Sequence, residues 1–87
     1  MFHKIKNVQY LENYIIEITF ENNIIKYYDV SNLFEKWDVF QNLVNIPNLF
    51  EQVKVEPGGY GISWNDEIDL SCEELWENGY IQNSESY

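Results

Sequence analysis

The chain has 87 residues, of which 15 are acidic and five are lysine, and its formal net charge is -10. One domain is the most that this length allows. Duplex DNA and RNA are bound by basic side chains that neutralise phosphates, and anionic membranes attract the same groups. We therefore expect neither direct nucleic-acid binding nor membrane binding.

The composition indicates a folded, cytoplasmic protein. Hydrophobic residues make up 45% of the chain and aromatic residues 17%, which is too apolar for intrinsic disorder. The single Cys72 permits no intramolecular disulfide, as is typical of a reducing compartment. The first residues lack the apolar stretch of a signal peptide, and no apolar run is long enough to span a membrane. We expect no cofactor.

The negative charge is concentrated in the last third of the chain. Residues 1–54 hold seven acids and all five lysines, whereas residues 55–87 hold eight acids and no base. The simplest interpretation is a solvated surface that keeps a small protein soluble. The alternative is an interaction surface, because asymmetric charge is also typical of segments that bind partners.

Three strands are predicted at the start of the chain, over residues 4–11, 14–21 and 24–29. The middle strand alternates with period two, which is typical of a half-buried antiparallel strand. Its apolar face carries Tyr14, Ile16, Ile18 and Phe20. If Asn22-Asn23 forms a two-residue hairpin loop, Phe20 pairs with Ile25 and Ile18 pairs with Tyr27. These four side chains would then share the apolar face.

Short helices are predicted next, with Ser31 and Asp38 as N-caps, and Ile46-Pro47 ends the second of them. Pro57-Gly58-Gly59 predicts a turn between a strand over 51–56 and a strand over 60–64. In the latter, Tyr60, Ile62 and Trp64 fall on one face. A short extended piece, 68–70, follows.

The last helix is predicted to begin after Ser71, which forms a capping box with Glu74, and to stop at Asn78-Gly79. The fold is therefore a small α+β domain over residues 1–81, with a frayed acidic tail over 82–87. It consists of a three-stranded N-terminal meander of antiparallel strands, a C-terminal hairpin, short helices between them and one C-terminal helix.

A set of short motifs in fixed order resembles the small bacterial domain-of-unknown-function family 2442 over roughly residues 4–76. The motifs are Ile5-Lys6-x-Val8, Tyr14-x-Ile16-x-Ile18-x-Phe20, Tyr28-Asp29-Val30, the single residues Leu43 and Phe50, Val53-x-Val55, Ile62-x-Trp64, Ile68-Asp69-Leu70 and Ser71-x-x-Glu74-Leu75. Two turns, Asn22-Asn23 and Asn65-Asp66-Glu67, depart from the glycine-containing turns of such proteins.

The resemblance implies a small α+β fold built on an antiparallel sheet, and it implies no enzyme activity. Such domains look like partners of other small bacterial proteins, sometimes in toxin–antitoxin-like pairs. Trp64, Asp69 and Tyr28 look structural: a core aromatic, a turn or cap acid and a strand-end aromatic.

The residues that catalysis would need are few. His3, the only histidine, lies at a terminus that we expect to be mobile. Cys72 is flanked by Glu73 and Glu74, whose charges oppose a thiolate, so we interpret it as a buried hydrophobic residue. Asp66, Glu67 and Asp69 could ligate a hard cation, but turn formation is the more ordinary role of such carboxylates.

The leading hypothesis is a non-enzymatic protein-interaction module that binds a partner with a basic surface, and the family resemblance allows an antitoxin-like role for it. The candidate partner-binding residues are Asp66, Glu67, Glu73, Glu74, Trp76 and Glu77. The chain also has more aromatic residues than a small core can hold, and exposed aromatics rimmed by acids would form a binding surface. The alternatives are an inhibitor that mimics nucleic acid and a small metal-dependent enzyme using Asp66, Glu67 and Asp69. A free sheet edge also permits a homodimer.

Overall fold

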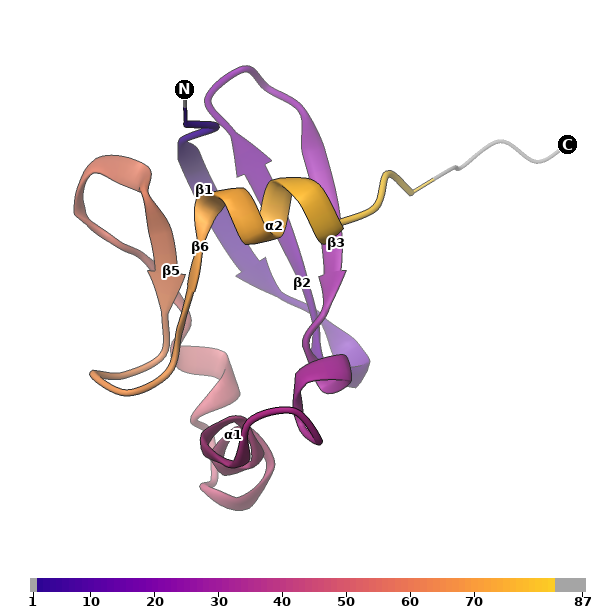
Figure 1. Ribbon diagram of the computed structural model, residues 1–87, viewed down its shortest axis with the longest axis vertical. Helices are drawn as coiled ribbons and strands as arrows, with labels where there is room; N and C mark the ends of the chain where they lie inside the picture. Colours follow the sequence, from indigo (N-terminus) through magenta and orange to yellow (C-terminus); the bar gives the residue numbers. More distant parts are fainter. Residues whose placement is uncertain (1, 83–87) are drawn as a thin grey trace, which may run out of the picture.

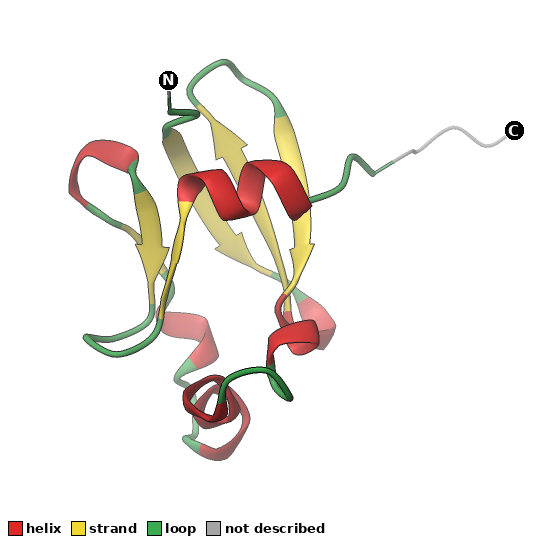
Figure 2. Ribbon diagram, viewed as in Figure 1, coloured by secondary structure: helices red, strands yellow, loops and turns green. Residues whose placement is uncertain are grey.

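A computed structural model describes residues 2–82 and shows two antiparallel three-stranded sheets joined by short helical turns, with one helix covering the first sheet (Figure 1). Short helical turns lie between several of the strands and between the two sheets (Figure 2). The elements are β1 (Ile5–Tyr10), β2 (Ile15–Phe20), β3 (Ile25–Asp29), α1 (Asn42–Asn45), β4 (Lys54–Val55), β5 (Gly61–Ser63), β6 (Asp69–Ser71) and α2 (Cys72–Asn78). The predicted α+β fold is confirmed.

The first sheet has the strand order β1-β2-β3, which is the predicted meander. Ile16, Ile18 and Phe20 of β2 are fully buried, so the period-two pattern placed the core face correctly. Isoleucine suits this position, because a branched side chain packs well on a pleated surface.

The predicted register of the β2–β3 hairpin is wrong by one residue. Ile18 pairs with Lys26, and Ile16 pairs with Tyr28. The loop contains three residues rather than two, since the Phe20 amide donates to the Ile24 carbonyl at 2.9 Å. Asn23 closes this loop with a left-handed φ of 70°.

The shift by one residue moves every side chain of β3 to the opposite face. Tyr28 is therefore buried, whereas Ile25 is exposed and Tyr27 faces outward opposite Glu17. The Tyr27 hydroxyl donates to the Glu17 carboxylate at 3.0 Å, which raises the pKa of Tyr27. The outer face of this sheet thus gains a tyrosine that the sequence had assigned to the core.

The helical turns that connect the two sheets begin differently from the prediction. The N-cap of the first turn, Val30–Leu33, is Asp29 rather than Ser31, because the Asp29 carboxylate accepts from the Ser31 amide at 3.0 Å. A second 3₁₀ turn, Asp38–Gln41, leads into α1 and has Trp37 at its N-cap without a side-chain cap, so Asp38 is not the cap. Ile46 is extended before Pro47 and ends α1 as predicted.

The second sheet has the order β4-β5-β6, so the predicted hairpin gains β6 as a third strand. Ile62 and Trp64 are buried as expected, and the Trp64 indole N–H donates to the Phe50 carbonyl at 3.1 Å. Tyr60 lies before β5 and is exposed, contrary to the prediction that it shares one face with Ile62 and Trp64. Gly61 allows the close approach of β6, since a Cβ there would lie 2.6 Å from the Leu70 carbonyl oxygen.

Helix α2 begins and ends where the sequence predicted. The Ser71 hydroxyl accepts from the Glu74 amide at 3.1 Å, and Gly79 follows the last helical residue. The helix crosses the core face of the first sheet (Figure 1), and it buries Cys72 and Leu75 there. One core cluster contains residues from both sheets and from α2.

The frayed tail predicted over residues 82–87 lies, apart from Gln82, outside the described residues. Among the residues that the structure does describe, no helix is long and apolar enough to cross a membrane.

The hairpin loop gives a direct test of the observed register. Asn23→Ala is expected to lower the free energy of unfolding by about 1 kcal/mol, because alanine is strained in the left-handed region. Asn23→Gly is the matched control and is expected to leave stability unchanged or higher. Urea denaturation of both variants measures the difference, and equal stabilities would contradict the three-residue loop.

Candidate functional site

The six predicted partner-binding residues occupy two separate places. Glu73, Glu74, Trp76 and Glu77 lie on α2. Asp66 and Glu67 lie in the turn between β5 and β6, at the end of β6 that is remote from α2 (Figure 1). The sequence therefore identified a charged region of the chain, but the fold does not assemble it into one surface.

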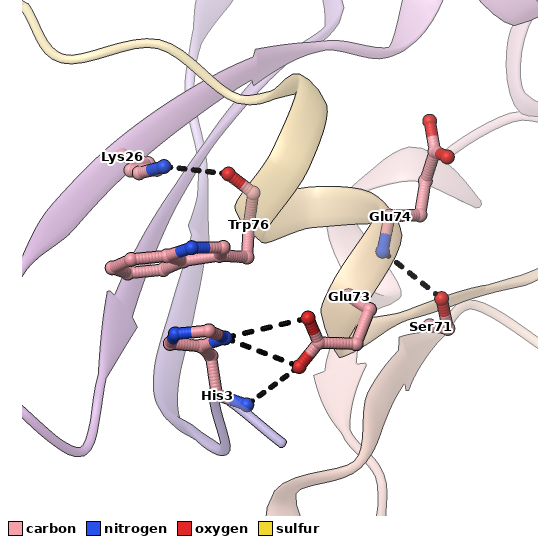
Figure 3. A network of polar contacts seen from close by, with 6 residues as sticks. All are labelled: His3, Lys26, Ser71, Glu73, Glu74 and Trp76. Atoms are coloured by element: carbon pink, nitrogen blue, oxygen red, sulfur yellow. Dashed lines mark hydrogen bonds and ion pairs between the residues drawn. The ribbon is translucent and has the colours of Figure 1, made fainter. Parts of the chain in front are cut away.

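Glu73 is held by the N-terminal segment rather than presented freely to solvent. The His3 amide donates to Glu73 Oε2 at 2.7 Å, and His3 Nδ1 lies 3.2 Å from the same oxygen (Figure 3). The backbone hydrogen bond from His3 is the main reason that the pKa of Glu73 lies below its ordinary value. We expected His3 to lie on a mobile terminus, whereas the structure places it in contact with Glu73 and Trp76.

Trp76 lies between two residues of other elements (Figure 3). The His3 imidazole stacks on its indole with ring centroids 3.9 Å apart, and Lys26 Nζ lies 3.9 Å from the indole centroid. Lys26 Nζ also donates to the Trp76 carbonyl at 2.5 Å, near the negative end of α2. Trp76 thus joins α2 to β3 and to the N-terminal segment.

Glu74 and Cys72 also contact the interior of the domain. The Tyr28 hydroxyl donates to Glu74 at 2.7 Å. Burial, together with this hydrogen bond, raises the pKa of Tyr28. Burial likewise raises the pKa of the Cys72 thiol, and the charge of Glu73 adds to the shift.

Asp66, Glu67 and Glu77 are the exposed members of the predicted set. The β5–β6 turn is held by Asn65, whose side-chain oxygen accepts from the Glu67 and Ile68 amides at 2.9 Å each. Within residues 2–82, no three acidic, histidine or cysteine side chains come together in a way that could hold a metal ion.

A surface groove lies away from the predicted residues, between the first sheet and the region of α1. This tyrosine groove has a volume of about 1050 Å³ and is lined by residues from four separate segments of the chain. Its aromatic and aliphatic lining includes Tyr10, Tyr14, Tyr27, Val44, Ile46, Pro47, Phe50 and Tyr80. Two carboxylates, Glu12 and Glu51, belong to the same lining. Sequence reasoning did not identify this groove.

The tyrosine groove gathers exposed apolar side chains. Tyr10, Val44, Ile46 and Tyr80 keep 44%, 49%, 45% and 46% of their surfaces accessible. Single exposed hydrophobic residues are ordinary, whereas several that line one hollow offer apolar surface that a bound segment could cover. Exposed aromatic side chains beside acids are therefore present here, on a surface other than the candidate partner-binding residues of α2.

The backbone of the groove is held in conformations that are unfavourable for side-chain-bearing residues. Asn13, Tyr14 and Asn48 have φ values of 62°, 61° and 67°, and all three line the groove. Tyrosine is rare in this region because of its bulk. The Tyr14 ring is fixed by edge-on contacts with Phe34 and Phe50, at centroid distances of 5.4 and 5.1 Å. Strain of this kind is concentrated at functional sites.

These features define a small α+β domain with a helix-covered sheet and an open, aromatic, acid-rimmed groove. The chain matches the family described as "Protein of unknown function (DUF2442)" over residues 5–80, which is nearly its whole length, and it belongs to that family. The resemblance noted in the sequence is thereby confirmed. No curated protein and no solved structure matches the chain.

The contact between His3 and Glu73 predicts how stability depends on pH. A folded-state pKa below the unfolded one means that ionised Glu73 stabilises the fold above its unfolded pKa. This contribution is lost as the pH falls through the folded-state pKa. Glu73→Gln is therefore expected to lower the melting temperature at neutral pH, with a difference from wild type that shrinks in acid.

Glu77→Gln is the control for this measurement, because it removes the same charge from an exposed position of α2. It is expected to reproduce the pH dependence of the wild-type melting temperature. If the two variants behave alike, the His3 contact does not stabilise the fold.

Proposed function

We propose that the chain is a non-enzymatic protein-interaction module that binds a partner with a basic surface. One observation carries the proposal. Within residues 2–82 the only basic side chain within ion-pair distance of a carboxylate is His3, beside Glu73, and no lysine lies that close to a carboxylate. The negative charge is thus uncompensated at the surface and is available to a partner of opposite charge.

The contacts of the lysines explain this imbalance. Lys26 donates to Trp76, Lys6 donates to Asn23 and Lys4 lies over the Tyr60 ring. Three of the five lysines therefore contact uncharged groups, and the acids receive little internal screening. Complementary charge accelerates encounter and selects the partner more than it adds affinity.

Two further features support a binding rather than a catalytic role. His3 and Cys72, the only histidine and cysteine, both serve packing: His3 stacks on Trp76 and Cys72 is buried. A thiol of raised pKa is a weak nucleophile at neutral pH. The proposal places the protein in the cytoplasm, where a lone buried thiol stays reduced.

Affinity capture from the source cells tests the proposal. The immobilised chain is expected to retain a basic protein that is released as salt is raised, because screening weakens exposed charge interactions. A triple variant, Asp66→Asn with Glu67→Gln and Glu77→Gln, is expected to retain less of it. With the purified partner, the variant should show a several-fold lower association rate and a weaker salt dependence.

Lys54→Gln is the matched control, since it removes an exposed positive charge and should leave association unchanged or faster. An acidic partner, or binding that is insensitive to salt and to the acidic variants, would refute the proposal.

A further inference from the structure

We propose that the tyrosine groove is the docking site for a segment of the basic partner in which an apolar side chain lies next to lysine or arginine. This inference rests on the proposed function and adds to it the place and the chemistry of recognition.

The apolar part of the partner follows from what the groove exposes. Four side chains of the lining leave about half of their surfaces in water: Tyr10, Tyr80, Val44 and Ile46. An inserted aliphatic or aromatic side chain would remove this surface from water together with its own. Tyrosine is also enriched at binding hot spots, because its ring offers a large area with few rotatable bonds.

The basic part follows from the charges. The groove lining contains Glu12 and Glu51 and no lysine, arginine or histidine. A third carboxylate, Glu17, accepts the hydroxyl of Tyr27, which is itself part of the lining. An acidic segment would be repelled, whereas a cation beside the apolar anchor meets both carboxylates and tyrosine ring faces.

The same charges argue against a second copy of this chain as the occupant. A copy would bring a net charge of -10 to a rim that already carries Glu12 and Glu51. Its lysines are mostly engaged in internal contacts, as Lys26 is with Trp76. A separate basic protein therefore fits the groove better than self-association does.

The groove is preformed, which reduces the entropy that binding must overcome. Tyr80 is tied to β3 by a pair of backbone hydrogen bonds, since the amides of Tyr27 and Tyr80 each donate to the other's carbonyl at 2.8 Å. The two rings lie 5.9 Å apart. Elsewhere in the lining, Tyr14 contacts Phe50, and Ile46 is extended before Pro47.

Selection from a displayed library of random short peptides against the whole chain tests the inference. The enriched peptides are expected to combine lysine or arginine with an adjacent aliphatic or aromatic residue. A synthetic copy of the strongest binder is then compared with two analogues, one with its bases changed to glutamate and one with its apolar residue changed to serine. Both analogues are expected to bind at least about tenfold more weakly.

Variants of the chain locate the site. Val44→Ser and Glu51→Lys change exposed groove residues and are expected to weaken the selected peptide by about tenfold each. Tyr60→Ser is the control, because Tyr60 is equally exposed but lies outside the groove. It should bind like the wild type, and circular dichroism should show that all three variants are folded.

The outcomes separate this inference from the proposed function. If basic peptides bind but ignore Val44→Ser and Glu51→Lys, or tolerate loss of their apolar residue, the groove is not the site while the basic partner stands. If no peptide is enriched, or the enriched peptides are acidic, the inference fails, whereas the proposed function is decided by the capture experiment. If Val44→Ser dissociates a dimer of the wild-type chain in sedimentation experiments, the occupant is a second copy and the inference is overturned.

Discussion

The packing of α2 across the first sheet is the contact on which the rest of the domain depends. Leu75 is fully buried, and Trp76 meets the Phe20 ring edge-on at 5.0 Å, so the helix covers the apolar face that β2 presents. The apolar face of a sheet must be buried against another element, and α2 is the element that buries it here. Because α2 directly follows β6, the same helix also fixes the second sheet beside the first.

The use of α2 in packing explains why its acids make a poor docking surface by themselves. Glu73 is bound by His3 and Glu74 by Tyr28, so these carboxylates stabilise the domain. The charge that remains exposed gives the molecule a long-range field, whereas the tyrosine groove offers the short-range contacts that a field alone cannot supply. In the interaction that we propose, the two features would act at different distances, and charged recognition surfaces combine rapid encounter with specificity in this way.

Local patterns predicted the elements well, and non-local geometry explains what they missed. Period-two alternation predicted the core face of β2, which carries Ile16, Ile18 and Phe20. The N-cap Ser71 predicted the start of α2. The predicted register of the β2–β3 hairpin was wrong because nothing in Glu21-Asn22-Asn23 distinguishes a two-residue from a three-residue loop. A shift of one residue nevertheless decides which tyrosine of β3 is buried. The sequence did not predict the tyrosine groove, because its lining residues come from segments that are distant in the sequence and meet only in the folded chain.

The sequence separation of the α2 contacts has a consequence for how the domain forms. β1, β2 and β3 pair as neighbours along the chain, whereas the hydrogen bonds from Tyr28 to Glu74 and from His3 to Glu73 span 46 and 70 residues. Local pairings form early, and contacts across long separations wait for loop closure. During synthesis the first sheet therefore emerges with its apolar face uncovered and stays so until α2 has left the ribosome, which makes this interval the step at which the chain is most exposed to aggregation.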